Sequence, residues 1–287
     1  MIYAYFYQIE YSEKCSFYKR NFLNQLINLV DISEKLERCN EIEKADIVFT
    51  IADFVNDSEL VGKKLVVYSL QDNSFTNEDI ILNKNILFVL DHCLNSQSKI
   101  IGDKVFCLLN ISELYKNKYQ SEVLPLSKRK YDIVFMGTTQ YDEKITKHRL
   151  DVIKNIEEVC SKNNLQCYTS NAPIKYSKYI KILNNTKIFI SPYGWGEFSL
   201  KEYECICFGV HIVKPKIYFQ YYPNYCENMD DFEIDFSNFE SKILDILVNL
   251  DNTQRKVDSN RKMFLDYCAH KHCVELENII LEKLNSK

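Results

Sequence analysis

The residues best suited to chemistry lie between Lys187 and Pro215, where Gly194 and Gly196 precede Ser199 and a stretch of helical spacing. The first N–H groups of a helix have no partner inside it, and the helix dipole is positive there. Glycines let the backbone approach a ligand closely, and a serine at this point caps the helix or donates a hydrogen bond. This pattern predicts an anion site at the helix start, suited to a diphosphate.

Glu204 is the second candidate, five residues after Ser199 on the same expected helix. A carboxylate at this place can accept hydrogen bonds from both hydroxyls of a ribose, which is the common acidic partner in nucleotide sites. The alternative is that Ser199 only caps the helix and that Glu204 lies on a solvated face. Periodicity alone does not separate these two interpretations.

Apolar runs and helical spacings show which elements would position these residues. Runs rich in β-branched and aromatic residues are typical of parallel strands covered on both faces. They predict strands at Ile2–Tyr7, Ala45–Ile51, Lys64–Leu70, Ile86–Leu90, Val105–Leu109, Tyr131–Phe135, Leu165–Tyr168, Ile188–Ile190 and Val210–Val213. Apolar residues three or four apart predict helices at Phe17–Val30, Lys147–Cys160, Tyr176–Leu183, Ser199–Phe208, Phe239–Leu250, Val257–Cys268 and Val274–Leu284.

The helix expected at Lys147–Cys160 carries a third candidate, Arg149, in its first turn and close to the loop at Gly137. An arginine there can clamp phosphate oxygens with two hydrogen bonds. The alternative is an ordinary surface charge. The apolar residues predicted to form the buried face of this helix are Leu150, Ile153, Ile156 and Val159.

The alternation of strands and helices occurs twice. Apolar periodicity stops from Tyr115 to Lys130, where lysines gather and Pro125 interrupts the chain, so we expect a linker there and domains at residues 1–125 and 126–287. A long surface loop inside one domain is the alternative, although structureless loops of this length are uncommon. Two such halves predict an α/β protein with two Rossmann-like domains facing a central cleft.

Composition narrows the class of partner. The 287 residues are 46% apolar and 26% charged, with a formal net charge of −4, which is typical of an ordinary globular protein and disfavours nucleic acid as a partner. The first residues do not resemble a signal peptide, and no run approaches the about 18 apolar residues of a membrane-spanning helix. Eleven cysteines without a CxxC pair indicate reduced thiols. We expect a cytoplasmic protein with no transmembrane segment, and peripheral membrane contact stays open.

The C-terminal half resembles a known family. The string from Ser191 to Pro215 is similar to the donor-binding signature of GT-B glycosyltransferases, above all exostosin-like (family 47-like) and related bacterial or viral transferases. The E-A-x-x-x-G-x-P-V-V half of that signature is matched by YECICFGVHIV, which contains Glu204 and Gly209. The first strand, loop and helix of the family's C-terminal domain are matched by YDIVFMGTTQYDEKITKHRLDVI.

The resemblance implies a GT-B-like fold and a nucleotide-diphosphate sugar as the donor. By this resemblance Glu204 would hold the donor ribose, Arg149 would hold the diphosphate, and the backbone from Gly194 to Leu200 would contact phosphate and sugar. The donor-binding residues implied are Gly137, Thr138, Arg149, Ser191, Tyr193, Gly194, Trp195, Gly196, Glu197, Ser199, Leu200 and Glu204.

Two departures from the family pattern bear on the mechanism. Glu197 and Glu204 are seven residues apart, whereas the acids of the retaining pattern are eight apart, and His211 takes the usual proline position. We therefore expect an inverting enzyme, which needs a general base near the acceptor hydroxyl. Asp72, Asp91 and His92 follow apolar strands of the N-terminal half and are candidates for this base. A turn-forming acid or a hydrogen-bonded histidine is the simpler interpretation of each.

The predicted activity is the transfer of a sugar from its nucleotide diphosphate to a hydroxyl of a glycan or another acceptor. The helix N-terminus and Arg149 would stabilise the leaving diphosphate, so no metal and no other cofactor is expected. His270, His272 and Cys273 lie close together but lack a further ligand at zinc spacing. The alternatives are a nucleotide- or glycan-binding protein without activity, and another group transferase on doubly wound domains.

Overall fold

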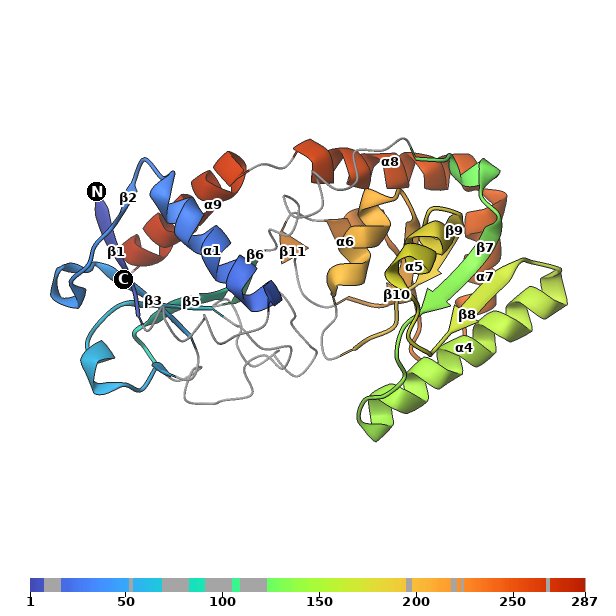
Figure 1. Ribbon diagram of the computed structural model, residues 1–287, viewed down its shortest axis with the longest axis horizontal. Coiled ribbons are helices and arrows are strands. Elements are labelled where there is room, and N and C mark those ends of the chain that lie inside the picture. The colour runs from blue at the N-terminus through green and yellow to red at the C-terminus, as the bar shows by residue number, and fades with distance from the viewer. Residues whose placement is uncertain are drawn as a thin grey trace. The chain divides into compact units, whose positions relative to one another are not determined.

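The computed structural model describes residues 1–7, 17–51, 54–68, 83–90, 105–108, 123–194, 198–217, 221–222, 225–266 and 269–286. The chain forms two compact units (Figure 1). The N-terminal unit contains Met1–Glu113, Gln220–Pro223 and Tyr267–Lys287, and the C-terminal unit contains Leu114–Phe219 and Asn224–Asp266.

The N-terminal unit is built on a sheet with the order β11-β6-β5-β4-β3-β1-β2, in which every pairing is parallel. Its strands are β1 (Ile2–Phe6), β2 (Leu36–Arg38), β3 (Ile47–Ile51), β4 (Leu65–Tyr68), β5 (Ile86–Leu90), β6 (Val105–Leu108) and β11 (Tyr221–Tyr222). Its helices are α1 (Phe17–Asp31) and α9 (Ala269–Asn285), with short 3-10 turns η2 (Ile42–Lys44) and η4 (Ser58–Leu60).

The last helix of the chain, α9, completes the core of this first unit. Figure 1 shows α9, in red, beside α1, in blue. Leu276 and Ile280 of α9 are buried in the core of this unit, where α9 contacts α1 and β5. Glu277 of α9 accepts hydrogen bonds from Ser33 Oγ at 2.5 Å and from the Glu34 amide at 3.0 Å. The predicted boundary between residues 125 and 126 stays a prediction, and the sequence did not indicate that the chain returns to its first unit.

The C-terminal unit has the strand order β12-β10-β9-β7-β8, again with parallel pairings throughout. Its strands are β7 (Tyr131–Met136), β8 (Cys167–Ser170), β9 (Thr186–Ile190), β10 (His211–Pro215) and β12 (Asp230–Phe232). Its helices are α4 (Glu143–Asn163), α5 (Tyr176–Leu183), α6 (Leu200–Cys207), α7 (Phe239–Val248) and α8 (Leu250–Asp266), with 3-10 turns η6 (Leu126–Lys128) and η7 (Tyr225–Asn228).

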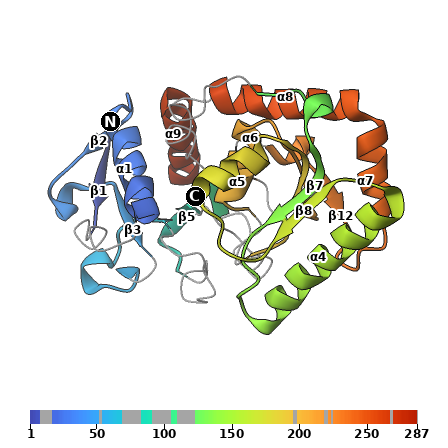
Figure 2. The ribbon, with the colours of Figure 1, turned by 45° about the vertical axis from the view of Figure 1, so that its right-hand side comes forward.

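Helices cover both faces of the C-terminal sheet. Alternate strand residues such as Ile133, Ile188 and Val213 pack against α4 and α7, and α5, α6 and α8 contact the strands on the other side (Figure 2). In chain order the strands run 5-4-3-1-2, so the winding direction reverses between β7 and β9. Ligands of open α/β sheets bind at the carboxyl ends of the strands at such a reversal. That places the expected site after Met136 and Ile190.

Three details differ from the sequence expectation for α4. Asp142 caps the helix by accepting a hydrogen bond from the Ile145 amide at 2.9 Å, so α4 begins at Glu143 and not at Lys147. Arg149 consequently lies in the second turn, and its predicted place in the first turn was wrong. Leu150, predicted on the buried face, is 46% exposed, because the face that packs on the sheet contains Val152, Ile156, Val159 and Cys160.

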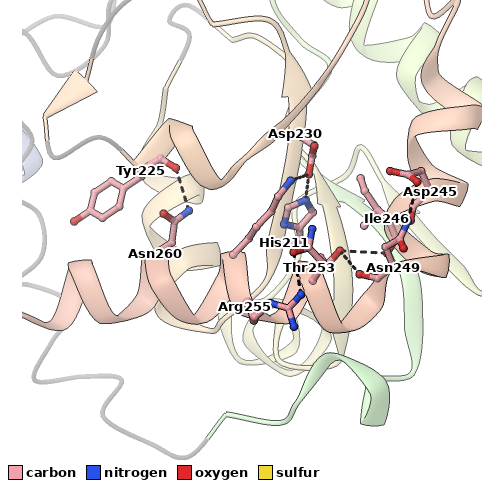
Figure 3. A network of polar contacts seen from close by, with 11 residues as sticks. His211, Tyr225, Asp230, Asp245, Ile246, Asn249, Thr253, Arg255 and Asn260 are labelled. Carbon is pink, nitrogen blue, oxygen red and sulfur yellow. Dashed lines mark hydrogen bonds and ion pairs between the residues drawn. The ribbon is translucent and has the colours of Figure 1, made fainter.

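His211, at the usual proline position of the family signature, begins β10 and ties this strand to its neighbour. Its Nε2 contacts Asp230 Oδ2 at 2.8 Å (Figure 3). Lys256 Nζ of α8 donates to the same oxygen at 2.8 Å. Burial lowers the pKa of His211, so the ring is neutral at pH 7. The acidic stretch at Asp230 is therefore an edge strand held by ion pairing, which its composition did not predict.

None of the helices in the described part of the chain is long and apolar enough to cross a membrane.

Candidate functional site

The anion site predicted at the start of α6 is framed by a capping box. Ser199 is the N-cap, its Oγ accepts from the Lys201 amide at 3.3 Å, and its own amide donates to Glu202 Oε2 at 2.8 Å. The predicted cap at Ser199 is confirmed. Gly209, at φ +60°, takes the left-handed conformation that ends the helix before β10.

Glu202 is buried, with 1% of its surface exposed, and its two oxygens serve several donors. Oε1 accepts from Ser191 Oγ at 2.8 Å and from Lys214 Nζ at 2.5 Å, and Oε2 also accepts from Ser199 Oγ at 2.5 Å. Burial by itself would raise the pKa of Glu202, but the ion pair with Lys214 and the serine hydrogen bonds lower it below its usual range. The Glu202 carboxylate is therefore ionised, next to the predicted anion site.

Two cationic side chains converge on Gly137, directly after β7. A Cβ at this glycine would stand 2.5 Å from Lys201 Nζ and 2.6 Å from Arg149 Nη2, so a larger residue would displace the ends of these two side chains. Arg149 is 5% exposed, and its Nη1 donates to the Tyr193 carbonyl at 2.8 Å. Lys201 Nζ donates to the Met136 carbonyl at 2.7 Å. Both cations thus lie at the carboxyl ends of β7 and β9, where the winding reverses.

The electrostatics of this pair favour an anion. Burial lowers the pKa of Arg149, and burial together with the charge of Arg149 lowers the pKa of Lys201 to about 8. Among the residues that the structure describes, buried Arg149 Nε has no hydrogen-bond partner, so this guanidinium has a donor available for a ligand. An anion beside Gly137 would offset the repulsion between Arg149 and Lys201 and would accept a hydrogen bond from Arg149.

His148 adds no charge to this arrangement. Its ring packs against Tyr193 and Phe236, with ring centroids 6.0 and 5.6 Å apart respectively. Burial and the neighbouring Arg149 lower the pKa of His148 to about 4, so it is neutral at pH 7. The positive charge of the site therefore comes from Arg149 and Lys201.

Glu204 is buried on α6 and is held by a tyrosine of α5. Tyr179 Oη donates to Glu204 Oε2 at 2.7 Å, and Tyr176 Oη lies 3.5 Å from Oε1. The solvated helix face considered as the alternative for Glu204 is therefore wrong. Its role toward a ribose stays a prediction.

The structure brings together many of the predicted donor-binding residues. Five of them belong to or contact the two cations or the capping box: Gly137, Arg149, Ser191, Tyr193 and Ser199. Gly194 lies against Tyr141, whose Oη would be 3.3 Å from a Cβ at that glycine. Thr138 Oγ1 accepts from the Gln140 amide at 3.0 Å, and Leu200 begins α6. The predicted residues Trp195, Gly196, Glu197, Asp72, Asp91 and His92 lie outside the described residues.

The sequence interpretation missed Lys201, Glu202 and Lys214. Two signals could have found them. The spacing Ser199-x-x-Glu202 is that of a capping box, and Lys214 interrupts an otherwise apolar strand, which is unusual unless the charge is paired. Lys201 carried no such signal, because a lysine on a helix is usually solvated.

Metal-ligating side chains do not gather in the part of the chain that the structure describes: no three His, Cys, Asp or Glu residues there could hold an ion. Cys273, one of the weak metal candidates, is buried in the core of the N-terminal unit. The side chains of His270 and His272 lie outside the described residues.

No protein-family model matches this sequence, and no curated protein matches it. The fold is shared with solved structures. The chain is similar to TarM, a GT-B glycosyltransferase, with a TM-score of 0.53 and 14% identity over 89% of this chain and 57% of TarM. The chain thus spans somewhat more than half the length of this relative.

Two further structures are similar. A Listeria monocytogenes protein provisionally assigned as a UDP-N-acetylglucosamine 2-epimerase gives a TM-score of 0.50 at 10% identity, covering 99% of this chain and 97% of that one. The pneumococcal O-GlcNAc transferase GtfA, solved with UDP and GlcNAc, gives 0.47 at 9% identity, covering 93% and 61%.

At these identities the likeness establishes the fold. The protein has an α/β fold of the GT-B class with two Rossmann-like units, as predicted. The exostosin-like branch of that class stays a prediction.

Proposed function

We propose that this chain is a glycosyltransferase that uses a nucleotide-diphosphate sugar and passes the sugar to a hydroxyl of a glycan or another acceptor. One observation carries the proposal. Arg149, which is buried, and Lys201, which is partly buried, converge on Gly137 beside the N-terminus of α6, at the winding reversal of the sheet. This is the arrangement that a leaving diphosphate requires, because negative charge accumulates there as the sugar departs.

The side chains divide the work as follows. Arg149 and Lys201 bind the diphosphate without a metal, and Glu204, oriented by Tyr179, accepts hydrogen bonds from the ribose hydroxyls. A base among Asp72, Asp91 and His92 takes the proton from the acceptor hydroxyl. The acceptor oxygen then forms a bond to the anomeric carbon while the bond from that carbon to the diphosphate breaks, with inversion of configuration. A cytoplasmic setting, where nucleotide sugars are available as donors, suits this reaction.

A second candidate is a nucleotide-sugar epimerase, favoured by the match over nearly the whole of the epimerase chain. An epimerase returns a nucleotide sugar with one altered centre, whereas a transferase releases nucleoside diphosphate in amounts equal to the sugar transferred. A protein that only binds the nucleotide would do neither.

The test is incubation with a panel of UDP-, GDP- and dTDP-sugars, with a chelator present, followed by assay for free nucleoside diphosphate and for altered nucleotide sugars. Release of nucleoside diphosphate supports the transferase. An altered nucleotide sugar without net release supports the epimerase, and thermal stabilisation without either supports a binding protein. Asp72→Asn, Asp91→Asn and His92→Ala identify the base if one of them abolishes turnover and keeps donor binding. If all three remain active, the base assignment is wrong.

A further inference from the structure

The segment Ser191–Gly194, which follows β9, and Ser199, which begins α6, are hydrogen-bonded to the same carboxylate. Ser191 directly follows β9 and donates to Oε1 of Glu202 at 2.8 Å. Ser199 begins α6 and donates to Oε2, at 2.8 Å from its amide and 2.5 Å from its hydroxyl. The Glu202 side chain therefore joins the start of this segment to the N-cap of α6.

Lys214 of β10 forms an ion pair with the Glu202 carboxylate. Its Nζ lies 2.5 Å from Glu202 Oε1 and 5.4 Å from the centroid of the Phe198 ring, and both charged side chains are buried, at 1% and 2% exposure. Burying an ion pair is costly, and apolar residues of similar volume often stabilise a fold as well or better. A capping box needs only Ser199 and Glu202. The contacts of Ser191 and Lys214 therefore exceed what folding of α6 requires.

Both cations of the anion site depend on elements that Glu202 joins. Arg149 Nη1 donates to the carbonyl of Tyr193, which lies two residues after Ser191. Lys201 belongs to the first turn of α6, between Ser199 and Glu202. A shift of the segment relative to α6 would move the two cations apart and would turn the helix start away from the anion.

We propose that Glu202 and Lys214 are positioning residues, which lock the Ser191–Gly194 segment to the start of α6 so that Arg149, Lys201 and the helix N–H groups meet one diphosphate. The inference rests on the proposed function of this site. Neither residue touches the anion itself. They hold the binding groups in the bound arrangement before the anion arrives. Binding then spends less free energy on ordering these groups, and the affinity is higher.

The test separates positioning from simple stabilisation. We compare wild type with Ser191→Ala, with the single variants Glu202→Gln and Lys214→Met, and with the double variant Glu202→Leu/Lys214→Met. Lys187→Met is the control, since it breaks the pair of Lys187 with Asp132, 2.6 Å apart in the same sheet and outside the segment. For each we measure the melting temperature, the Kd for inorganic pyrophosphate, and amide hydrogen exchange in the first turn of α6.

We expect Ser191→Ala to weaken pyrophosphate binding by about tenfold and to speed exchange in the first turn of α6. The double variant should melt at least as high as wild type and still bind weakly and exchange fast. The control should melt lower and bind normally. If the double variant recovers wild-type affinity and exchange, the pair merely compensates buried charge and the inference is overturned. If Ser191→Ala exchanges and binds like wild type, the segment is not held by Glu202.

The proposed function can fail separately. If the wild-type protein binds neither pyrophosphate nor UDP, the anion site is not what we propose. The exchange rates of Ser191→Ala and of the double variant would still decide whether Glu202 and Lys214 hold the segment.

Discussion

Lys201 is the residue whose charge state should be visible in binding. Burial, reinforced by the charge of Arg149, lowers its pKa to about 8, so the ammonium loses its proton in an accessible range. Lysine is cationic below its pKa, and therefore affinity for pyrophosphate should be full near pH 7 and should fall as the pH rises through about 8. A bound anion favours the charged form and shifts the fall upward.

The measurement is the Kd for pyrophosphate from pH 6.5 to 10, in wild type and in Lys201→Arg. The arginine keeps its charge across this range, so the fall should flatten in the variant. A wild-type affinity that is constant up to pH 10 would show that Lys201 does not bind the anion.

Glu204 should separate the nucleoside from the diphosphate. Glu204→Gln removes a charged acceptor of ribose hydroxyls, and a hydrogen bond to a charged group contributes about 1.5–3 kcal/mol. We expect UDP to bind at least about tenfold more weakly, with pyrophosphate unaffected, by isothermal titration. Tyr179→Phe, which removes the donor at 2.7 Å, should give a smaller loss of the same kind. Equal losses for both ligands would mean that Glu204 supports the fold of the site and not the ribose.

At the scale of elements, α6 ends because Gly209 takes the left-handed backbone conformation. Gly209→Ala places a Cβ at φ +60°, 3.4 Å from Val257 and from the Arg129 guanidinium. The left-handed conformation costs an alanine about 1 kcal/mol, so urea unfolding should show a loss of at least about that size. Pyrophosphate affinity should be unchanged, because the substitution lies at the opposite end of the helix from Ser199. A stability equal to wild type would contradict the assigned conformation.

The elements themselves were largely predictable, and the reason is periodicity. Strands such as Thr186–Ile190 and helices such as Tyr176–Leu183 follow apolar patterns that burial imposes on each segment separately. The short strand Asp230–Phe232 could not be predicted, because its acidic residues are stabilised by contacts with His211 and Lys256 from distant parts of the chain. The same holds for the site. The glycine and serine signals indicated an anion loop, whereas the position of the Lys201 ammonium depends on its hydrogen bond to the Met136 carbonyl of β7.

At the scale of the whole molecule, the N-terminal unit is built from separate stretches of the chain, and its last stretch contains α9. A helical pattern near the C-terminus predicts α9 but not the core that it covers, and Leu276 packs in the N-terminal unit. Leu276→Ala should destabilise that unit by about 2–5 kcal/mol, as truncation of a buried leucine does. Hydrogen exchange should accelerate in α1 and β5, which α9 contacts, and stay unchanged in β7 and β9. Faster exchange confined to β7 and β9 would contradict the assignment of α9.

In the proposed reaction Arg149 and Lys201 take the place of a metal at the leaving diphosphate. The most direct test of this role is the rate of nucleoside diphosphate release from the best donor of the sugar-nucleotide panel, in excess EDTA, for wild type, Arg149→Gln and the control Lys187→Met. We predict that wild type and the control turn over in the chelator and that Arg149→Gln is slower by about a hundredfold or more at a similar melting temperature. Release that stops in EDTA and returns with Mg²⁺, or an Arg149→Gln variant as fast as wild type, would contradict the account.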